Sequence, residues 1–324
     1  MEKTSKPAVR WMDISAGEAG QRIDNFLLRT LKGVPKSRIY RLLRKGEVRV
    51  NKGRIRPEYR LQAGDQVRIP PVRVSERAPA TPDPSAIQRL ADAIIYEDKR
   101  LLVLNKPSGM AVHGGSGLSY GVIEALRVLR PDAPYLELVH RLDRDTSGCL
   151  LIAKRRSELR TLHELLRNGA VEKRYLLLAQ GDWSQGPFRL DAPLRKNLLH
   201  GGERMVRVDP EGKTALTEFR FLEGYPGASL MEAVLKTGRT HQIRVHAAHA
   251  GHPLAGDGKY GDAAFNRRMR DMGLKRLFLH AHYVAFEDRE RGRSVEVSAP
   301  LGPGLRKLVQ QLETTPDTGH EGQQ

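Results

Sequence analysis

Apolar residues recur at helical spacing in two segments near the start of the chain. The first segment spans residues 22–28 and the second spans residues 37–45. Apolar residues three and four positions apart fall on one face of a helix, so both segments are predicted to be amphipathic helices. Ser37 is expected to cap the start of the second helix, and Gly46 is expected to end it.

Short alternating segments follow these two helices. Residues 48–51 alternate between apolar and polar as a half-buried strand does, residues 51–53 are typical of a turn, and residues 61–69 end in a second short strand. The pattern therefore predicts a small, helix-rich domain over residues 17–73. The residues before it, 1–16, are expected to be flexible.

A change of composition separates this domain from a larger one. The segment VSERAPATPDP, which begins at Val74, contains three prolines. Because proline disrupts a helix interior, we expect a linker over residues 74–86. A second domain is expected over residues 87–312. The polar segment 313–324 is expected to be a disordered tail.

Strands predominate in the second domain. Apolar runs bounded by polar turns predict buried strands, and apolar residues at helical spacing predict the helices between them. This succession favours an α+β fold with a mixed, mainly antiparallel sheet flanked by helices. The expected strands lie in 94–104 (a hairpin), 135–139, 149–153, 171–180, 217–222 and 229–236, and the expected helices in 157–168 and 240–250, with Ser157 and Thr240 as caps.

The charge of the chain indicates a polyanionic partner. Its 324 residues include 55 Lys and Arg against 38 Asp and Glu, a net charge of +17. Residues 22–73 alone hold 15 Lys and Arg against 4 Asp and Glu, about two-thirds of that excess. A solvated surface usually mixes both signs, so the first domain is predicted to bind nucleic acid.

Composition also argues against several classes of protein. The single cysteine, Cys149, lies in an apolar run, so neither an internal disulfide nor a cysteine-based zinc site is expected, and a reducing compartment fits. The chain has no run of 18 apolar residues, and residues 1–11 lack the apolar core of a signal peptide. We therefore expect a cytoplasmic protein that does not enter a membrane.

The most informative stretch is HRLDRDTSG at residues 140–148, which lies between two apolar runs. Arg141 and Arg144 flank Asp143, and neighbouring cations favour the charged form of a carboxylate. The Thr-Ser-Gly that follows is typical of a compact turn. An aspartate fixed among arginines suits a nucleophile or general base acting on an anionic polymer. A structural salt bridge in a loop explains this stretch equally well.

A second stretch, residues 235–246, joins the end of a predicted strand to a basic helix. Arg244 lies one turn into that helix, on the face that carries His241. Its guanidinium can pair with Asp143 or with a phosphate, because it offers a planar fork of donors. The alternative is a solvated basic helix.

A third candidate, Tyr175, lies where charged residues give way to an apolar strand. A tyrosine in this position can stack on a base or relay a proton. More commonly such a residue only packs, with its hydroxyl reaching water.

Metal sites are not expected. Four histidines occur close together, but the His-Glu-x-x-His motif and any cysteine partner are missing. These histidines are His241, His246, His249 and His252. A two-metal nuclease built on Asp143 and Asp145 would require further carboxylates, and the surrounding arginines oppose cation binding.

Together these stretches resemble the RluA family of pseudouridine synthases, which act on uridines in RNA. The resemblance is carried by His140-Arg141-Leu142-Asp143 with the following Thr-Ser-Gly, and by residues 237–246. The first domain is similar to the S4 RNA-binding domain. Residues 194–206 look like the type of this family that modifies large-subunit ribosomal RNA. Supporting segments are residues 105–109, 173–175 and 256–261.

The resemblance implies site-specific isomerisation of uridine to pseudouridine in 23S, large-subunit ribosomal RNA, with no cofactor and no metal. It implies Asp143 as the catalytic aspartate, Tyr175 as the active-site aromatic residue and Arg244 as the partner of Asp143. The target base must turn out of the RNA stack to reach these groups. Tyr175 would then sandwich the base and could take its C5 proton. A monomer is the simplest expectation. The residues expected to hold RNA are Lys36, Arg38, Arg41, Lys45, Lys52, Arg141, Arg144, Arg239 and His241.

The alternative from another class is a non-catalytic factor that binds ribosomal RNA during ribosome assembly. The charge excess alone would explain such binding. Plain binding does not require Asp143, Tyr175 and Arg244 in combination, however. The sequence does not select the uridines that are converted. It also does not choose among attack by Asp143 on the sugar, attack on the base and removal of a sugar proton.

Overall fold

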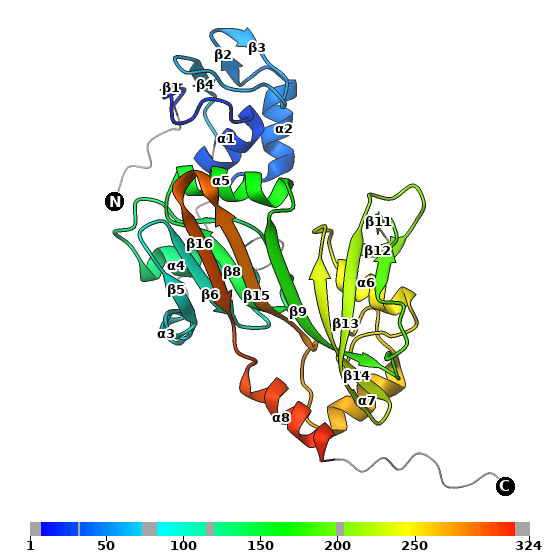
Figure 1. Ribbon diagram of the computed structural model, residues 1–324. Coiled ribbons are helices and arrows are strands. Elements are labelled where there is room, and N and C mark those ends of the chain that lie inside the picture. Colours follow the sequence, from blue (N-terminus) through cyan, green and yellow to red (C-terminus); the bar gives the residue numbers. More distant parts are fainter. Residues whose placement is uncertain (1–7, 32, 73–82, 115–119, 199–203, 315–324) are drawn as a thin grey trace, which may run out of the picture. The chain divides into compact units, whose positions relative to one another are not determined.

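A computed structural model describes residues 8–31, 33–72, 83–114, 120–198 and 204–314. The chain forms two compact units, residues 1–80 and residues 81–324 (Figure 1). Parts of several predicted segments lie outside the described residues. These parts are residues 1–7 of the expected flexible N-terminus, 74–82 of the expected linker, 201–203 of the segment 194–206 and 315–324 of the expected tail.

The first unit packs two helices against a small antiparallel sheet with strand order β1-β4-β2-β3. Apolar side chains from the helices and from one face of the sheet form a single core, including Phe26, Leu27, Ile39, Val67 and Ile69. The elements are β1 (Arg10–Asp13), α1 (Ile23–Thr30), α2 (Lys36–Arg44), β2 (Arg49–Val50), β3 (Gly53–Arg54) and β4 (Gln66–Ile69).

Two expectations for this unit were wrong. Residues 10–13, expected to be flexible, form strand β1 and pair with β4, with Trp11 opposite Arg68. Most of β1 is exposed, so apolar alternation could not reveal it. Ser37 is not a cap, because α2 begins at Lys36 directly after Pro35 and has no side-chain cap.

A ten-stranded sheet organises the second unit, with order β10-β13-β14-β9-β15-β8-β6-β5 and with β16 beside β15 and β7 beside β8. The pair β15–β8 is parallel and the other pairs are antiparallel. The predicted mixed, mainly antiparallel sheet is therefore confirmed. The strands are β5 (Ile94–Glu97), β6 (Leu101–Lys106), β7 (Glu137–Leu138), β8 (Ser147–Ala153), β9 (Val171–Gln180), β10 (Arg189–Asp191), β13 (Leu216–Tyr225), β14 (Ala228–Leu235), β15 (Leu279–Asp288) and β16 (Arg293–Ser298), and a separate ribbon is formed by β11 (Leu194–Leu198) and β12 (Arg204–Val208).

Helices cover both faces of this sheet. On β8, Leu150 and Ile152 belong to a core with α3, α4 and α6, whereas Leu151 and Ala153 belong to a core with α5. A third core packs α7 and α8 near Leu178 of β9. In the described part of the chain, no helix combines the length and apolar composition of a bilayer span. The helices are α3 (Pro84–Asp92), α4 (Val122–Leu129), α5 (Arg156–Arg167), α6 (Gln242–His249), α7 (Ala263–Asp271) and α8 (Pro303–Glu313).

Several boundaries differ from the predicted ones. Helix α3 begins at Pro84, inside the expected linker 74–86, because Asp83 caps it and proline suits a first helical turn. Helix α8 extends to Glu313, the first residue of the expected tail 313–324. Neither Ser157 nor Thr240 acts as a cap, since the residues before α5 and α6 are Arg155 and His241.

Gly148 allows β8 to pair with β15 immediately after the loop that carries Asp143. Gly148 lies opposite Ala281 in the parallel pair, with a φ of 109°. A Cβ at this position would lie 2.2 Å from the carbonyl oxygen of Ala281 and 2.6 Å from its carbonyl carbon. Contact with backbone cannot be relieved by a rotamer change, so only glycine fits.

We expect Gly148→Ala to lower the free energy of unfolding by about 3 kcal/mol or more, because positive-φ strain of about 1–2 kcal/mol adds to overpacking of about 1–3 kcal/mol. Gly169→Ala is the matched control, since Gly169 has a φ of 70° but nothing within 4 Å of an added Cβ. Denaturant unfolding of both variants measures the difference. Equal losses would contradict the steric account.

Candidate active site

Asp143 lies in the loop that leads into β8, and hydrogen bonds brace this loop. The carbonyl of Asp143 accepts a hydrogen bond from the amide of Thr146 at 3.2 Å, which closes the compact turn. The hydroxyl of Ser108 donates to the carbonyl of Asp145 at 2.7 Å. Leu142 is buried in the core beneath. The carboxylate of Asp143 is therefore presented from a fixed backbone, with its side chain 21% exposed.

Lys106, at the end of β6, provides a further brace. Its buried Nζ donates to the carbonyls of Pro107, Met110 and Arg144 at 2.9, 2.8 and 3.0 Å. Burial lowers the pKa of Lys106 to about 7. Three carbonyl acceptors favour the charged form, since only the ammonium has three donors. Lys106 thus ties residues 107–110 to the loop of Asp143.

Arg244 projects from α6 and is fixed by Asp257. Its Nε and Nη2 donate to the two carboxylate oxygens of Asp257, each at 2.7 Å. Its Nη1 lies 3.8 Å from Oδ2 of Asp143. Burial would lower the pKa of Arg244, but the contacts with Asp257 outweigh burial and raise it. Burial would raise the pKa of Asp257, but hydrogen bonds from Arg244 lower it. Both groups therefore stay charged, with one edge of the guanidinium facing Asp143.

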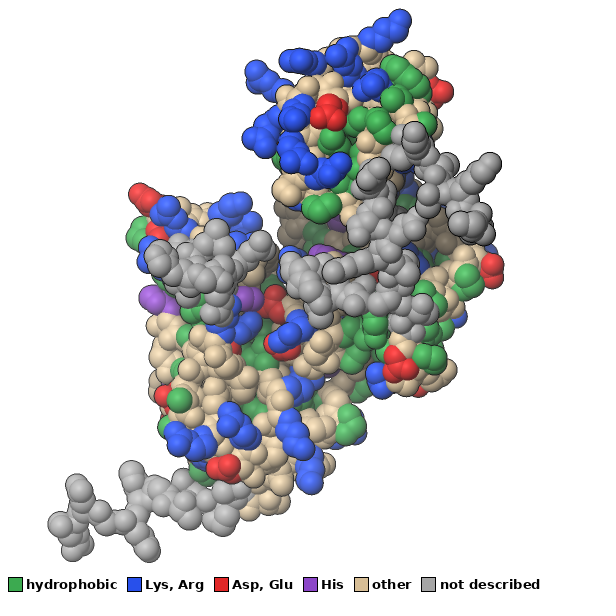
Figure 2. All heavy atoms as spheres, turned by 180° about the vertical axis from the view of Figure 1, so that it is seen from behind, with side chains coloured by type: hydrophobic (Ala, Val, Ile, Leu, Met, Phe, Trp, Pro, Cys, Tyr) green, Lys and Arg blue, Asp and Glu red, His purple; other side chains and the backbone are tan. Residues whose placement is uncertain are grey.

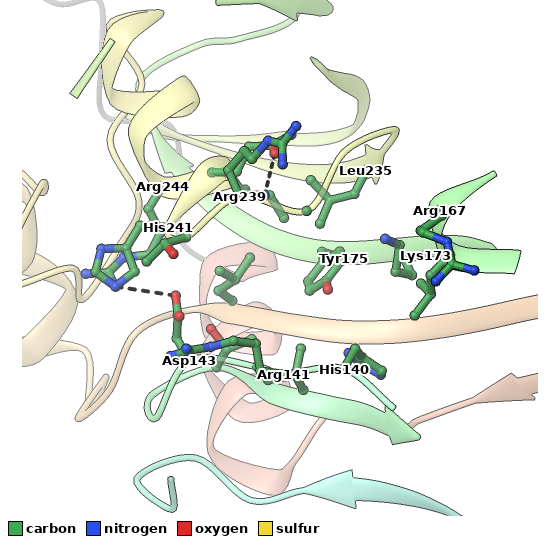
Figure 3. A pocket seen from close by; sticks show the side chains of 18 of the residues that line it. His140, Arg141, Asp143, Arg167, Lys173, Tyr175, Leu235, Arg239, His241 and Arg244 are labelled. Carbon is green, nitrogen blue, oxygen red and sulfur yellow. Dashed lines mark hydrogen bonds and ion pairs between the residues drawn. The ribbon is translucent and has the colours of Figure 1, made fainter. Parts of the chain in front are cut away.

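His241 is a second neighbour of the Asp143 carboxylate. Its Nε2 lies 3.7 Å from Oδ2 of Asp143 (Figure 3), and its Nδ1 lies 2.7 Å from the hydroxyl of Tyr260. That hydroxyl accepts a hydrogen bond from the amide of Val206 at 3.0 Å, so its own proton is free to bind Nδ1. Burial lowers the pKa of His241, which favours the neutral ring. The matching tautomer carries its proton on Nε2, facing Asp143.

These groups form one end of a pocket of about 460 Å³, a volume within the usual range for small-molecule sites. Figure 3 shows Asp143, His241 and Arg244 at one end, Tyr175 and Leu235 in the middle, and Lys173 and Arg167 at the other end. Tyr175 is only 6% exposed. Burial and the nearby Asp143 charge raise the pKa of Tyr175, so its phenol stays neutral.

The structure brings the three residues expected to be catalytic to this pocket. Asp143, Tyr175 and Arg244 all line it, as do Arg141, Arg239 and His241 from the predicted RNA-binding set. A histidine that binds RNA through its ring needs a free ring nitrogen. Both ring nitrogens of His241 instead face protein groups.

Arg144 does not line the pocket. It is exposed and pairs with Asp145 at 3.1 Å. Arg239 lines the pocket but is partly engaged, because its Nε donates to the carbonyl of Thr214 at 2.9 Å.

The predicted RNA-binding residues of the first unit lie on α2, directly after it and in the β2–β3 turn. Arg38 is partly buried, and within the described residues its Nε has no hydrogen-bond partner. Figure 2 shows Lys and Arg side chains gathered on the visible face of this unit. The exposed members of the set are Lys36, Arg41, Lys45 and Lys52.

Three side chains that shape the site had no role assigned from the sequence. Lys106, Asp257 and Tyr260 occurred only within segments that supported the resemblance. The sequence feature that could have identified Lys106 is a lysine at the end of an apolar strand. Among the residues that the structure describes, no group of three His, Cys, Asp or Glu side chains is placed to hold a metal ion.

Comparison with known proteins identifies the family of this chain. Residues 100–249 match the RNA pseudouridylate synthase family, and residues 21–67 match the S4 domain. The chain is 59% identical to ribosomal large subunit pseudouridine synthase C of Pasteurella multocida, over 95% of each chain. It is 57% identical to the protein of that name from Escherichia coli K12, over 96% of this chain and 98% of the other.

Solved structures show the same fold for the second unit. Human RNA pseudouridylate synthase domain containing 4 matches with a TM-score of 0.59 and 25% identity, over 71% of this chain and 96% of that one. Given the identity and coverage of the curated relatives, the chain belongs to the RNA pseudouridylate synthase family of isomerases, with an S4 domain ahead of its catalytic domain.

Proposed function

We propose that this enzyme isomerises uridine to pseudouridine at specific positions in large-subunit ribosomal RNA. The names of its relatives support the substrate. The observation that carries the proposal is the placement of Asp143, whose carboxylate oxygen lies 3.8 Å from Arg244 and 3.7 Å from His241 in a pocket walled by Tyr175. An aspartate held in this way is presented to a bound nucleoside.

The reaction moves the bond between base and sugar from N1 to C5 of the uracil. No electrons and no phosphate are exchanged, so the chemistry requires neither a redox cofactor nor a nucleotide. A uracil stacked in RNA hides the reacting atoms, so the base must turn out into the pocket. We propose that Asp143 then acts on the nucleoside, as a nucleophile at the sugar or base or as a base toward a sugar proton.

Tyr175 is proposed to pack against the uracil. Its side chain is buried, and the raised pKa of its phenol opposes a role as proton acceptor. Aromatic contact with a turned-out base is worth about 1–3 kcal/mol in nucleic-acid complexes. Packing by Tyr175 therefore helps to offset the loss of stacking.

The remaining expectations are proposals on the same basis. We propose that the enzyme acts as a monomer, the simplest arrangement. A cytoplasmic location is proposed from the ribosomal RNA substrate and from the single buried cysteine. The exposed basic residues of α2 and of the β2–β3 turn are proposed to bind the RNA backbone.

Asp143→Asn is expected to lower the rate of isomerisation by about 10³-fold or more, because it removes the reacting carboxylate while keeping its shape. Tritium release from [5-³H]uridine-labelled RNA measures turnover, and equilibrium binding should change by less than a few-fold. In cells that lack the protein, chemical mapping should show particular pseudouridines missing from large-subunit RNA. If expression of Asp143→Asn in those cells restored the missing pseudouridines, the role of Asp143 would be contradicted.

Asp257→Asn is expected to lower kcat by about 10- to 100-fold with little change in RNA affinity, because Arg244 loses its charged anchor. The pKa of Asp257 is lowered in the fold, so its carboxylate stabilises the folded state above about pH 4. This contribution is lost as acid protonates the carboxylate. The difference in stability between wild type and variant should therefore shrink on acidification. Asp271→Asn, at the exposed end of α7, is the control; a similar loss of kcat there would contradict the account.

Replacing Arg41, Lys45 and Lys52 with Gln is expected to weaken RNA binding and to reduce its salt dependence. Each lost phosphate contact lowers the slope of log K against log salt by about 0.7–0.9, so a reduction of about 2 is expected. The control replaces three exposed basic residues on and after α7: Arg267, Arg270 and Lys275. Filter binding at several salt concentrations measures both slopes, and equal slopes would refute RNA contact by the first unit.

A further inference from the structure

The pocket has an uneven distribution of charge. Its lining includes five Lys and Arg residues but only one carboxylate, that of Asp143. Two of the five cations are engaged, since Arg244 is held by Asp257 and Arg239 donates to a backbone carbonyl. Among the residues that the structure describes, the side chains of the other three, Arg141, Lys173 and Arg167, have neither an ion pair nor a hydrogen bond, and Arg141 lies at the Asp143 end of the pocket (Figure 3). The end of the pocket beyond Tyr175 therefore carries cations without a protein anion.

Lys173 is the central residue of this end. It lies two positions before Tyr175 on β9, so both side chains point to the same face of the strand. Lys173 is partly buried, and burial lowers its pKa. Taking a cation out of water without a counter-charge costs free energy. That cost indicates that something outside the chain completes the site.

Lys173 also lines an adjacent hollow with six carboxylates, those of Glu164, Glu172, Glu287, Asp288, Glu290 and Glu296. Within the described residues, none of these forms an ion pair with Lys173 or Arg167, so neighbouring groups do not supply the missing anion. The carboxylate of Glu172 is paired with Arg174 at 2.8 Å, and its side chain points to the opposite face of β9. His140 is a close neighbour, and burial and the charge of Lys173 lower its pKa to about 4, so its ring is neutral. The amine of Lys173 and the guanidinium of Arg167, which line the same end of the pocket in Figure 3, are left to an outside ligand.

We infer that Lys173 and Arg167 form a subsite for a backbone phosphate of the RNA substrate, on the far side of Tyr175 from Asp143. The inference rests on the proposed function. A uracil carbonyl is uncharged and would leave the partly buried Lys173 uncompensated, whereas a phosphodiester brings the required negative charge and accepts hydrogen bonds from Lys173 and from the exposed Arg167. The nucleotide would then be held at its phosphate while its base packs on Tyr175 and its sugar faces Asp143.

Lys173→Met tests the subsite. Affinity for a large-subunit RNA fragment, and kcat/KM for its isomerisation, should fall about 10- to 100-fold, the range for hydrogen bonds to charged groups. Lys173→Arg should retain most of both. Because the change replaces an unpaired, partly buried charge by an apolar chain, the melting temperature should stay the same or rise. A lower melting temperature would indicate a structural lysine and overturn the inference.

Arg160→Met is the matched control for Arg167→Met. Arg160 lies seven residues earlier on the same face of α5, is exposed and does not line the pocket. If general attraction of RNA were the cause, both variants would lose equal affinity. The subsite requires a clearly larger loss for Arg167→Met, and equal losses would overturn it.

Neutral methylphosphonates, introduced one at a time along the RNA fragment, locate the phosphate. Wild-type enzyme should lose affinity at one linkage next to the target uridine, and Lys173→Met should lose nothing further at that linkage. If the variant and wild type respond identically at every linkage, Lys173 does not bind a phosphate. Binding requires no turnover, so absence of pseudouridine formation by wild-type enzyme would refute the proposed function and leave the subsite to be judged by affinity.

Discussion

The bidentate ion pair between Arg244 and Asp257 is the interaction on which the site depends. A buried guanidinium without a partner would be strongly disfavoured, and Asp257 supplies two hydrogen bonds of 2.7 Å that keep both groups charged. Because Asp257 fixes the Nε and Nη2 edge of the guanidinium, Nη1 faces Asp143 at a defined distance. A lysine could not replace Arg244, since a single ammonium cannot satisfy Asp257 and face Asp143 with the same geometry.

Tyr260 connects this pair to the rest of the pocket. Its ring lies under the Arg244 guanidinium, and its hydroxyl links the amide of Val206 on β12 to His241. His241 itself has a φ of 53°, which costs free energy for a residue other than glycine. The contacts with Tyr260 and Asp143 help to hold His241 in that conformation. The β11–β12 ribbon and the start of α6 are therefore coupled to the position of Asp143.

The sequence predicted those parts of the structure that depend on local pattern. Strand β9 was predicted with its observed bounds, because its apolar run is long and ends at a glycine. The meeting of Asp143, Tyr175 and Arg244 followed from a resemblance rather than from spacing. Asp257 was not assigned a role, since its partnership with Arg244 arises from tertiary folding of a turn. Lys106 was missed because its partners are backbone carbonyls, and its position at the end of an apolar strand marks it without revealing them.

The two ends of the pocket differ in electrostatic character, and this difference favours one position for a phosphate next to the turned-out nucleotide. At one end the charges of Asp143 and Asp257 are balanced by Arg244 and Arg141, so that end has little net attraction for a phosphate. At the other end Lys173 and Arg167 have no counter-charge within the described part of the chain. Tyr175 is neutral and lies between the ends. A nucleotide that placed its phosphate beside Asp143 would leave the cationic end unpaired, so the charge pattern favours a phosphate beyond Tyr175.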